Sequence, residues 1–345
     1  MESKLHDFYS DTKSIPTRAM LESIVSAPLG DEQKAEDPTT ARLEERVAKL
    51  LGKEKAVFMI SGTMCNEIAV RVHCRPGDEV ICDTSCHLLN FECGSPAALS
   101  GVVLHPLQGT NGIFGRGDVH RAIRPKSRYM PVSKMLLVEQ TANLGGGAVW
   151  PIDTIDAVLE EAKKHGLVAH MDGARLLNAV AKTGISPERY ARDFDTVWID
   201  FSKGLGAPCG AVIAGSAEFC HEAWRQKQAL GGAMRQSGVL AAACLYALDN
   251  HIEQQVVDNN LAASIGERIS KIPQVTNMLP VDTNIIVFDV SADAPTAADI
   301  VDQLKARGVL LGAFGERRLR AVTCLNVDEV SADKLVEELS AVLTD

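Results

Sequence analysis

Short apolar runs alternate with helical patterns over the first two-thirds of the chain. Between residues 38 and 51, apolar side chains recur at positions 43, 47, 50 and 51, which is the spacing of one helix face, and Gly52 ends that pattern. Runs typical of buried strands lie at 56–60, 79–82, 101–104, 134–138, 167–169 and 196–199, and a second helical pattern covers 154–164. Alternating strands and helices predict a mostly parallel sheet that is covered by helices on both faces.

The pattern changes after about residue 245. We expect a long helical stretch over 240–269, strand-like runs at 283–289 and 319–323, a helix near 297–307 and a closing helix through Leu335 and Leu339. The chain therefore divides into an N-terminal segment (1–40), a large domain (41–245) and a smaller α+β domain (246–345). The first 40 residues are polar and rich in turn residues, so they fit either domain.

Composition and charge limit the classes of partner that this protein can bind. The formal net charge of −10 argues against nucleic acid and anionic membranes as partners. No apolar segment approaches the length needed to span a membrane, and no apolar signal core follows Glu2, Lys4 and Asp7. The nine cysteines are odd in number and show no repeated spacing, which indicates reduced thiols. We therefore expect a cytoplasmic protein whose partner is a small molecule.

Metal chemistry has little support from the cysteine pattern. Cys82 with Cys86, or Cys220 with Cys244, could in principle bind a metal, but no Cys-x-x-Cys pair or matching histidine accompanies them. We therefore expect no metal site.

A lysine and a carboxylate follow two of the predicted strands. Lys203 stands in a Ser-Lys-Gly-rich turn directly after the run 196–199, and Asp172 closes the run that begins near 167. Burial of a lysine favours a nucleophilic amine, which can bond to a carbonyl cofactor. An Asp paired with the pyridine nitrogen and a Lys on the aldehyde carbon are the usual partners of pyridoxal phosphate. A surface lysine and a helix-capping aspartate are the alternative.

A third element lies where the strand at 56–60 meets the next predicted helix. Ser61-Gly62-Thr63 would present backbone N–H groups and a hydroxyl at a helix N-terminus, which suits a phosphate. The same tripeptide is also an ordinary turn and N-cap. Gly145-Gly-Gly147 is a competing phosphate loop, but it does not clearly open a helix. We interpret it as a turn that lets backbone pass close to a ligand.

Six ordered motifs together resemble one family. The chain is similar to the low-specificity L-threonine aldolases, which belong to the β-eliminating lyase group of fold-type-I pyridoxal phosphate enzymes. The resemblance covers residues 8 to 328. Its motifs are Ser10-Asp-Thr12 with Pro16-Thr17, Glu36-Asp-Pro-Thr39, Ser61-Gly-Thr-Met64, Asp172-Gly-Ala-Arg175, Ser202-Lys-Gly-Leu-Gly-Ala-Pro208 and Leu230-Gly-Gly-Ala-Met-Arg-Gln236.

The resemblance implies an α/β fold with a large, mostly parallel sheet domain and a smaller C-terminal α+β domain. It also implies a set of cofactor-binding residues. Lys203 would bind the cofactor covalently, Asp172 would pair with the pyridine nitrogen, and Arg175 would lie near the ring hydroxyl and the substrate carboxylate. The phosphate would be bound by Gly62, Thr63 and, from a neighbouring subunit, Arg235. A homodimer or homotetramer with shared active sites follows.

The resemblance also assigns the substrate end of the site. Ser10 and Arg320 would bind the substrate α-carboxylate, because a guanidinium grips a carboxylate with two parallel hydrogen bonds. His87 matches the histidine that lies over the cofactor ring, and it is our candidate for the base that removes the proton of the β-hydroxyl.

Each of these residues also has a plain structural interpretation. Arg175 could pair with Asp172, Arg235 could be a surface residue, and His87 could stack without moving a proton. The neighbours Arg317 and Arg318 could replace Arg320. His170 is best interpreted as a core histidine, and the histidines without an expected role are His73, His105, His120, His165, His221 and His251.

Several positions depart from the family pattern. Ala142 stands at a position where the family usually has a histidine, and Lys34 stands where an aromatic residue is usual. Further departures are Tyr9, Phe91 and Cys324. Ala142 would leave room for a larger β-substituent and Lys34 would meet a negative charge. We therefore expect L-threonine to be a poorer substrate than a bulkier or acidic β-hydroxy amino acid.

The resemblance implies a lyase that cleaves a β-hydroxy-α-amino acid to glycine and an aldehyde. Candidate substrates are of the L-threonine, L-allo-threonine, phenylserine or 3-hydroxyaspartate type. The alternative is a β-eliminating lyase or transaldolase that uses the same cofactor, since fold alone does not decide reaction type. A third hypothesis, a non-catalytic regulator, is disfavoured by the acidic charge and by the retention of Lys203.

Overall fold

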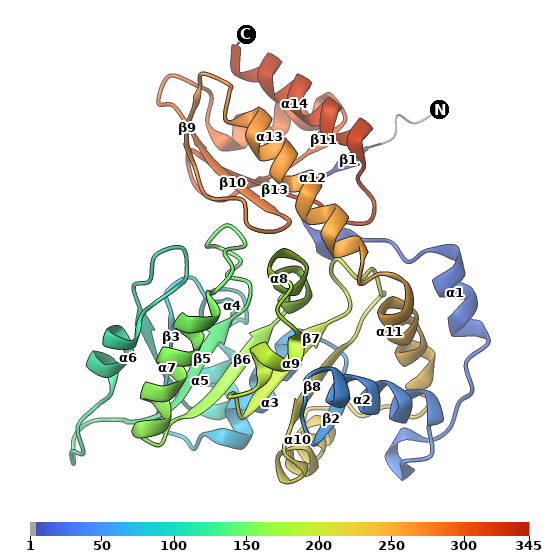
Figure 1. The fold of residues 1–345 in the computed structure, drawn as a ribbon, viewed down its shortest axis with the longest axis vertical. Helices are drawn as coiled ribbons and strands as arrows, with labels where there is room; N and C mark the ends of the chain where they lie inside the picture. The colour runs from blue at the N-terminus through green and yellow to red at the C-terminus, as the bar shows by residue number, and fades with distance from the viewer. Residues whose placement is uncertain (1–4, 345) are drawn as a thin grey trace.

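Residues 5–344 are described by a computed structural model, so Glu2 and Lys4 lie outside the described part. Two bodies lie one above the other, and the N-terminal segment runs between them (Figure 1). The lower body contains a seven-stranded sheet in the order β2-β8-β7-β6-β5-β3-β4. Its strands are β2 (Lys55–Met59), β3 (Asp78–Asp83), β4 (Val103–Leu107), β5 (Val132–Glu139), β6 (Val168–Gly173), β7 (Thr196–Asp200) and β8 (Ala211–Gly215).

The sheet is parallel except at one strand. β8 pairs antiparallel with both β2 and β7, whereas β3, β4, β5, β6 and β7 pair in parallel. The strand β8 was not predicted, because its small residues give no strong strand pattern, although all five are buried. The remaining six strands lie where the apolar runs predict them, within a few residues.

Helices cover both faces of this sheet, as the alternating pattern predicts. Along β2, Phe58 packs into one core with α2 and α7, while Val57 and Met59 face a second core with α3 and α10. The helices of the lower body are α2 (Pro38–Leu50), α3 (Gly62–His73), α4 (His87–Asn90), α5 (Ser95–Ser100), α6 (Arg116–Ala122), α7 (Ile152–Lys164), α8 (Leu176–Thr183), α9 (Pro187–Ala191), α10 (Ala217–Ala229) and α11 (Gly238–Asn250).

The upper body is an antiparallel sheet with helices. Its order is β12-β13-β10-β9, and its core includes apolar side chains of the helices α12, α13 and α14. The elements are α12 (Gln254–Ile269), β9 (Val275–Met278), β10 (Ile285–Val290), α13 (Ala297–Ala306), β11 (Val309–Leu310), β12 (Gly312–Ala313), β13 (Arg318–Val322) and α14 (Glu329–Thr344). The mixed α/β class with a large, mostly parallel sheet is confirmed.

The predicted helix over 240–269 is two helices instead of one. α11 ends at Asn250, and α12 begins at Gln254 after a turn. The ring of His251 forms a hydrogen bond to the carbonyl of Leu205 at 2.8 Å, so the chain turns where it meets the loop after β7. No glycine or proline marks this break in the sequence.

The N-terminal segment contacts both bodies. β1 (His6–Asp7) pairs with β11, and Phe8 packs in the upper core. Beyond the 3-10 turn η1 (Asp11–Lys13), α1 (Arg18–Val25) packs against α11, and Met20 is part of the lower core. A second 3-10 turn, η2 (Glu32–Lys34), precedes α2. The segment thus crosses the space beyond the carboxyl ends of the parallel strands.

None of the helices in residues 5–344 has the length and apolar character needed to cross a membrane.

Candidate active site

A cavity of about 370 Å³ lies beyond the carboxyl ends of the central strands. Its size is that of a pocket for a small organic ligand. The polar lining residues are Ser10, Thr12, Ser61, Thr63, His87, Glu139, Asn143, Asp172, Arg175, Asp200, Ser202, Lys203 and Arg320, and the rest are Tyr9, Gly62, Phe91, Ala174, Trp198 and Phe314. Eight of the ten predicted site residues therefore meet in one cavity.

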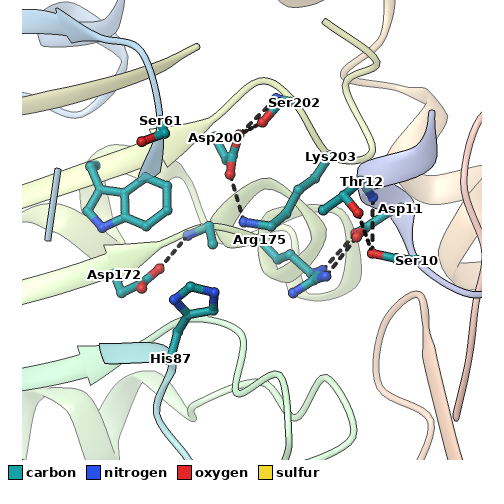
Figure 2. Close-up of polar contacts among 12 residues, drawn as sticks. Ser10, Asp11, Thr12, Ser61, His87, Asp172, Arg175, Asp200, Ser202 and Lys203 are labelled. Atoms are coloured by element: carbon teal, nitrogen blue, oxygen red, sulfur yellow. Dashed lines mark hydrogen bonds and ion pairs between the residues drawn. The ribbon is translucent and has the colours of Figure 1, made fainter. Parts of the chain in front are cut away.

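Lys203 reaches into this cavity from the turn that follows β7 (Figure 2). Its side chain is 15% exposed, and Nζ lies 2.7 Å from Oδ2 of Asp200, the last residue of β7. The other oxygen of Asp200 accepts hydrogen bonds from the backbone N–H and the hydroxyl of Ser202, at 2.8 and 2.7 Å. The turn is thus fixed by one carboxylate, which also forms an ion pair with Lys203.

Asp172 is placed by strand register. On neighbouring strands it pairs with Glu139 and with Trp198, so the three side chains lie in a row across β5, β6 and β7. Asp172 is 1% exposed; Oδ1 accepts from the N–H of Ala174 at 3.0 Å, and Oδ2 accepts from Nδ2 of Asn66 at 2.8 Å. A carboxylate that is satisfied by neutral donors only is suited to a cationic partner on its cavity side.

The N-terminus of α3 lines the cavity beside Lys203 and Asp172. Ser61 is the N-cap, with its hydroxyl accepting from the N–H of Met64, and the first intrahelical bond runs from Cys65 to the Ser61 carbonyl. Gly62 and Thr63 line the cavity, and their N–H groups precede both bonds, as an anion site requires. A Cβ on Gly62 would lie 2.2 Å from the indole of Trp198, so only glycine fits there.

The competing glycine loop does not approach the cavity. Gly145, Gly146 and Gly147 form a turn, and none of them lines the cavity. A Cβ on Gly145 would meet the carbonyl of Asn111 at 2.0 Å, so the glycines allow close packing of protein against protein. The expectation that this backbone passes close to a ligand is therefore wrong for this chain.

Arg175 and Asp11 form a buried pair at the opposite end of the cavity. Nε and Nη2 of Arg175 donate to the two oxygens of Asp11, both at 2.7 Å. Burial raises the pKa of Asp11, but the adjacent guanidinium outweighs it and lowers that pKa to about 2. Asn284 donates to the same carboxylate at 3.0 Å. Arg175 therefore pairs with Asp11 and not with Asp172.

Arg320 is the guanidinium with spare donors. Nη1 donates to Oδ1 of Asn143 at 2.9 Å, Nη2 donates to the carbonyl of Tyr9 at 3.2 Å, and the group stacks on Phe314 at 4.1 Å. Its Nε is buried without a partner among the described residues. Burial, together with the charge of Arg175, lowers the pKa of Arg320 to about 10. A carboxylate ligand would give Nε a hydrogen-bond partner and would stabilise the charge of Arg320.

The neighbours of Arg320 are engaged elsewhere. Arg317 donates to the carbonyl of Ala294, Arg318 forms two hydrogen bonds with Asp289, and neither lines the cavity. Of the three candidate arginines, Arg320 is the one that reaches the cavity.

His87 opens the short helix α4 on the side facing Asp172 (Figure 2). The backbone N–H of His87 donates to Oε2 of Glu139 at 2.5 Å, and the ring Nδ1 lies 2.8 Å from Oε1 of Glu92. Burial opposes a charge on the ring, but the hydrogen bond to Glu92 and the charges of Asp172 and Glu139 outweigh it and raise the pKa of His87. Burial and the charge of Asp172 raise the pKa of Glu139 to about 7.

Two predicted residues lie outside the cavity of their own chain. Arg235 has a side chain that is 61% exposed and pairs with Asp31 at 3.0 Å, and Lys34 is exposed on η2. Ala142 is buried and does not line the cavity either. Its position gives no support to the expected enlargement of the substrate pocket, and the roles of Lys34 and Arg235 stay predictions about a second subunit.

Several residues that shape the site were not found in the sequence. Asp11 stands inside a recognised motif and Asp200 two residues before another, but their pairing with Arg175 and Lys203 became visible only in the fold. Glu92 and Asn66 contact His87 and Asp172 from elements whose spacing carries no signal. Glu139 is the last residue of a strand, a place where a charged residue after an apolar run is a usable signal.

Comparison with known proteins identifies the family. The model of the β-eliminating lyase family matches residues 7–293. The chain belongs to this family. It is 38% identical over 324 residues to low-specificity L-threonine aldolase 1 of Arabidopsis thaliana, with 92% of this chain and 90% of that protein covered. It is 35% identical over 332 residues to the low specificity L-threonine aldolase of Escherichia coli K12, with 96% of both covered.

A solved structure agrees in fold. Threonine aldolase of Leishmania major superposes with a TM-score of 0.83 at 20% identity, covering 98% of this chain and 99% of that one. The expected family, fold-type-I architecture and lyase class are thereby confirmed. As a member of the β-eliminating lyases, the protein is a pyridoxal-phosphate-dependent enzyme.

The residues of the cavity fit this cofactor. Lys203 would supply the amine for the aldehyde, Asp172 would supply a buried carboxylate for the pyridine nitrogen, and the first turn of α3 would supply the donors for the phosphate. When bound, the cofactor accepts the electrons that are left on the substrate Cα after bond cleavage.

Proposed function

We propose that this enzyme cleaves the Cα–Cβ bond of β-hydroxy-α-amino acids, giving glycine and an aldehyde. The observation that carries the proposal is the meeting, in one cavity, of Lys203, Asp172, His87 and Arg320. They provide an amine for the cofactor, a counter-charge for its ring, a base and a carboxylate-binding cation. A retro-aldol reaction needs these four functions together.

Arg320 orients the substrate in this proposal. Its guanidinium already holds the Tyr9 carbonyl and Asn143, and its unpartnered Nε is free to bind the substrate α-carboxylate. The hydroxyl of Ser10 accepts from the N–H and the hydroxyl of Thr12, which places it on the same side of the cavity. Fixing the carboxylate fixes the direction of the Cα–Cβ bond.

His87 removes the proton of the β-hydroxyl. A carboxylate at Nδ1 requires the proton to reside there, so Nε2 keeps its lone pair for the substrate. The raised pKa of His87 makes the ring a stronger base than an ordinary imidazole.

The β-substituent would meet aromatic surface. Tyr9 and Phe91 line the cavity and are 45% and 46% exposed, so part of each ring is available for contact. We therefore propose a broad substrate range that includes L-phenylserine as well as L-threonine.

The smallest complete unit is proposed to be a homodimer. Its support is the position of Arg235, which is outside the cavity of its own chain and largely exposed. A cytoplasmic location is also proposed, because none of the nine cysteines, all within the described part of the chain, is in a disulfide.

The test is a product assay on cofactor-loaded protein with L-threonine, L-phenylserine and 3-hydroxyaspartate. Glycine, aldehyde and keto acid are measured together, and Lys203→Ala serves as the inactive control. Glycine and aldehyde in equal amounts, absent with Lys203→Ala, are the expected result. Keto acid without glycine would replace the aldolase by a β-eliminating lyase.

A further inference from the structure

Asn66 lies between the two carboxylates that serve the site. It is fully buried on α3, one turn after the predicted phosphate-binding residues. Its Nδ2 donates to Oε1 of Glu92 at 2.7 Å and to Oδ2 of Asp172 at 2.8 Å. One amide group thus bridges two acidic side chains that come from different elements.

The orientation of this amide follows from its other contacts. The indole Nε1 of Trp198, which can only donate, lies 2.7 Å from Oδ1 of Asn66. Oδ1 must therefore face the indole, and both N–H bonds point at the carboxylates. Nε2 of His170 lies 3.2 Å from the same oxygen, while its Nδ1 contacts Thr196 at 2.8 Å. His170 is thus a hydrogen-bonded core histidine, as expected.

The bridge extends to His87. Oε1 of Glu92 contacts both Asn66 and Nδ1 of His87, and Oε2 of Glu92 is buried without a partner among residues 5–344. All the hydrogen bonds of the Glu92 carboxylate therefore pass through one oxygen. Moving the Asn66 amide would move Glu92, and with it the proton on Nδ1 of the histidine.

We propose that Asn66 is a positioning residue that aligns Asp172 with the cofactor ring and, through Glu92, fixes the tautomer of His87. The effect of Asn66 on catalysis rests on the proposed function, whereas its effect on the tautomer of His87 is independent of that function. Asn66 offers two donors to two acceptors, whereas alanine offers none and aspartate would add a third carboxylate. Loss of the bridge leaves two buried acids without a shared donor.

The test uses Asn66→Ala and Asn66→Asp, with Asn259→Asp as the matched control. Asn259 is also buried and bonded through its amide, but to Asn178 and away from the cavity. The imidazole ¹⁵N shifts of cofactor-free protein are followed by NMR across pH, with His87 assigned from His87→Gln. We expect one Nδ1-protonated form in wild type and control, and a mixture of tautomers in both Asn66 variants.

Kinetics supply the second readout. Misplacement of the base and of Asp172 should lower kcat/KM by about 100-fold in the Asn66 variants. Unchanged ¹⁵N shifts in a folded Asn66 variant would overturn the proposal. If neither variant folds, Glu92→Leu, which offers Nδ1 no acceptor, is measured in their place, and an unchanged His87 tautomer there would overturn the proposal equally. Altered tautomers in an enzyme that releases keto acid would support Asn66 and overturn the aldolase assignment.

A second, independent site lies between α6 and α7. The ligand atoms of His120, Glu161 and His165 are within 4.8 Å of one another. Nδ1 of His120 lies 2.8 Å and Nε2 of His165 3.2 Å from Oε1 of Glu161. Tetrahedral zinc with ligands at about 2.0–2.1 Å would separate them by about 3.4 Å, so small rotations suffice.

The surroundings fit a bound cation with one open position. The side chain of Glu161 is 7% exposed, and its carboxylate contacts both imidazoles and the guanidinium of Arg116. The side chains of His120 and His165 are 66% and 36% exposed, which leaves access for water as a fourth ligand. Arg116, which donates to Oε2 of Glu161 at 3.0 Å, has to tolerate the added charge.

We propose that these three residues bind Zn²⁺ and tie α6 to α7. The test is calorimetric titration of untagged, cofactor-loaded enzyme with zinc sulfate, comparing wild type, His120→Ala and His165→Ala. His221→Ala, which removes an exposed histidine on α10, is the control. One equivalent bound by wild type and control and lost in both site variants is expected. No binding to wild type, or equal binding to all four proteins, would overturn the site.

Discussion

The two ends of the cavity are built in different ways. The cofactor end comes from adjacent strands of one sheet, where register puts Glu139, Asp172 and Trp198 in a row and the turn after β7 adds Lys203. The carboxylate end is assembled from segments that are far apart in the chain. There Asp11 binds both Arg175, at 2.7 Å, and Asn284, at 3.0 Å.

The geometry of the cofactor end is therefore set by a sheet, whereas that of the carboxylate end depends largely on one buried ion pair. A strand register is held by many backbone hydrogen bonds, so one substitution leaves it in place. The carboxylate end has fewer constraints: the buried Asp11 pairs with Arg175, the N-cap of α8, and accepts a hydrogen bond from Asn284, which precedes β10. Substitutions at the two ends should therefore fail differently.

The largest effect is expected at Asp11. Asp11→Ala leaves the buried charge of Arg175 without its partner, which should lower the free energy of unfolding by about 3–5 kcal/mol. Urea unfolding of cofactor-free protein measures it, with Asp7→Ala, at a half-exposed pair with Lys13, as control. A loss of unfolding free energy below about 1 kcal/mol would mean that other contacts hold the carboxylate end as firmly as strand pairing holds the sheet.

The same pair predicts how stability depends on pH. The pKa of Asp11 is lowered from 3.8 to about 2, so its contribution is complete above pH 3.8 and is lost as the pH falls through 2. In Asp11→Ala this part of the acid dependence should be absent.

Arg320→Leu should act mainly on substrate binding. Removing a charge-assisted hydrogen-bonding group costs about 1.5–3 kcal/mol, so kcat/KM should fall about 10- to 100-fold, mainly through KM. Arg318→Leu, on the same strand but paired with Asp289, is the control and should stay near wild type. Equal losses in both variants would show that the strand, and not the guanidinium, matters.

The pH profile tests the cofactor end. Because the pKa of His87 is raised, kcat/KM should fall on the acidic side at a pH above the ordinary 6.5 of an imidazole. Glu92→Gln removes a negative charge, so it should move that limb to lower pH. The control is Glu79→Gln, since Glu79 contacts His105 in the same manner outside the cavity. A limb that does not move would exclude His87 as the base.

The smallest effect is expected at Lys34. It is exposed and outside the cavity of its own chain, so Lys34→Ala should leave kcat/KM for L-threonine unchanged. If its ammonium reaches a partner's cavity, kcat/KM for 3-hydroxyaspartate should fall by up to about fivefold, the range of an exposed ion pair. Kinetics with both substrates decide it, and no change for either would leave Lys34 without a role.

Much of the cofactor end was predictable, for a physical reason. Lys203, Asp172 and Gly62 each follow a short apolar run, and the carboxyl ends of parallel strands meet at one edge of a sheet. The partners Asp200 and Glu92 were not predictable, because a hydrogen bond between side chains leaves no periodic trace. The strand β8 was missed because its small residues give no strong strand pattern, and the break at His251 was missed because it depends on a contact with the loop after β7.

The sequence by itself determined the alternation of elements, the family and the residue types that bear the chemistry. Only the tertiary structure decided which of them work together. It paired Arg175 with Asp11, chose Arg320 over Arg317 and Arg318, placed Asn66 between two carboxylates and brought His120 to Glu161 and His165. Local patterns are written into neighbouring residues, whereas these contacts join segments up to 311 positions apart and exist only once the cores have closed.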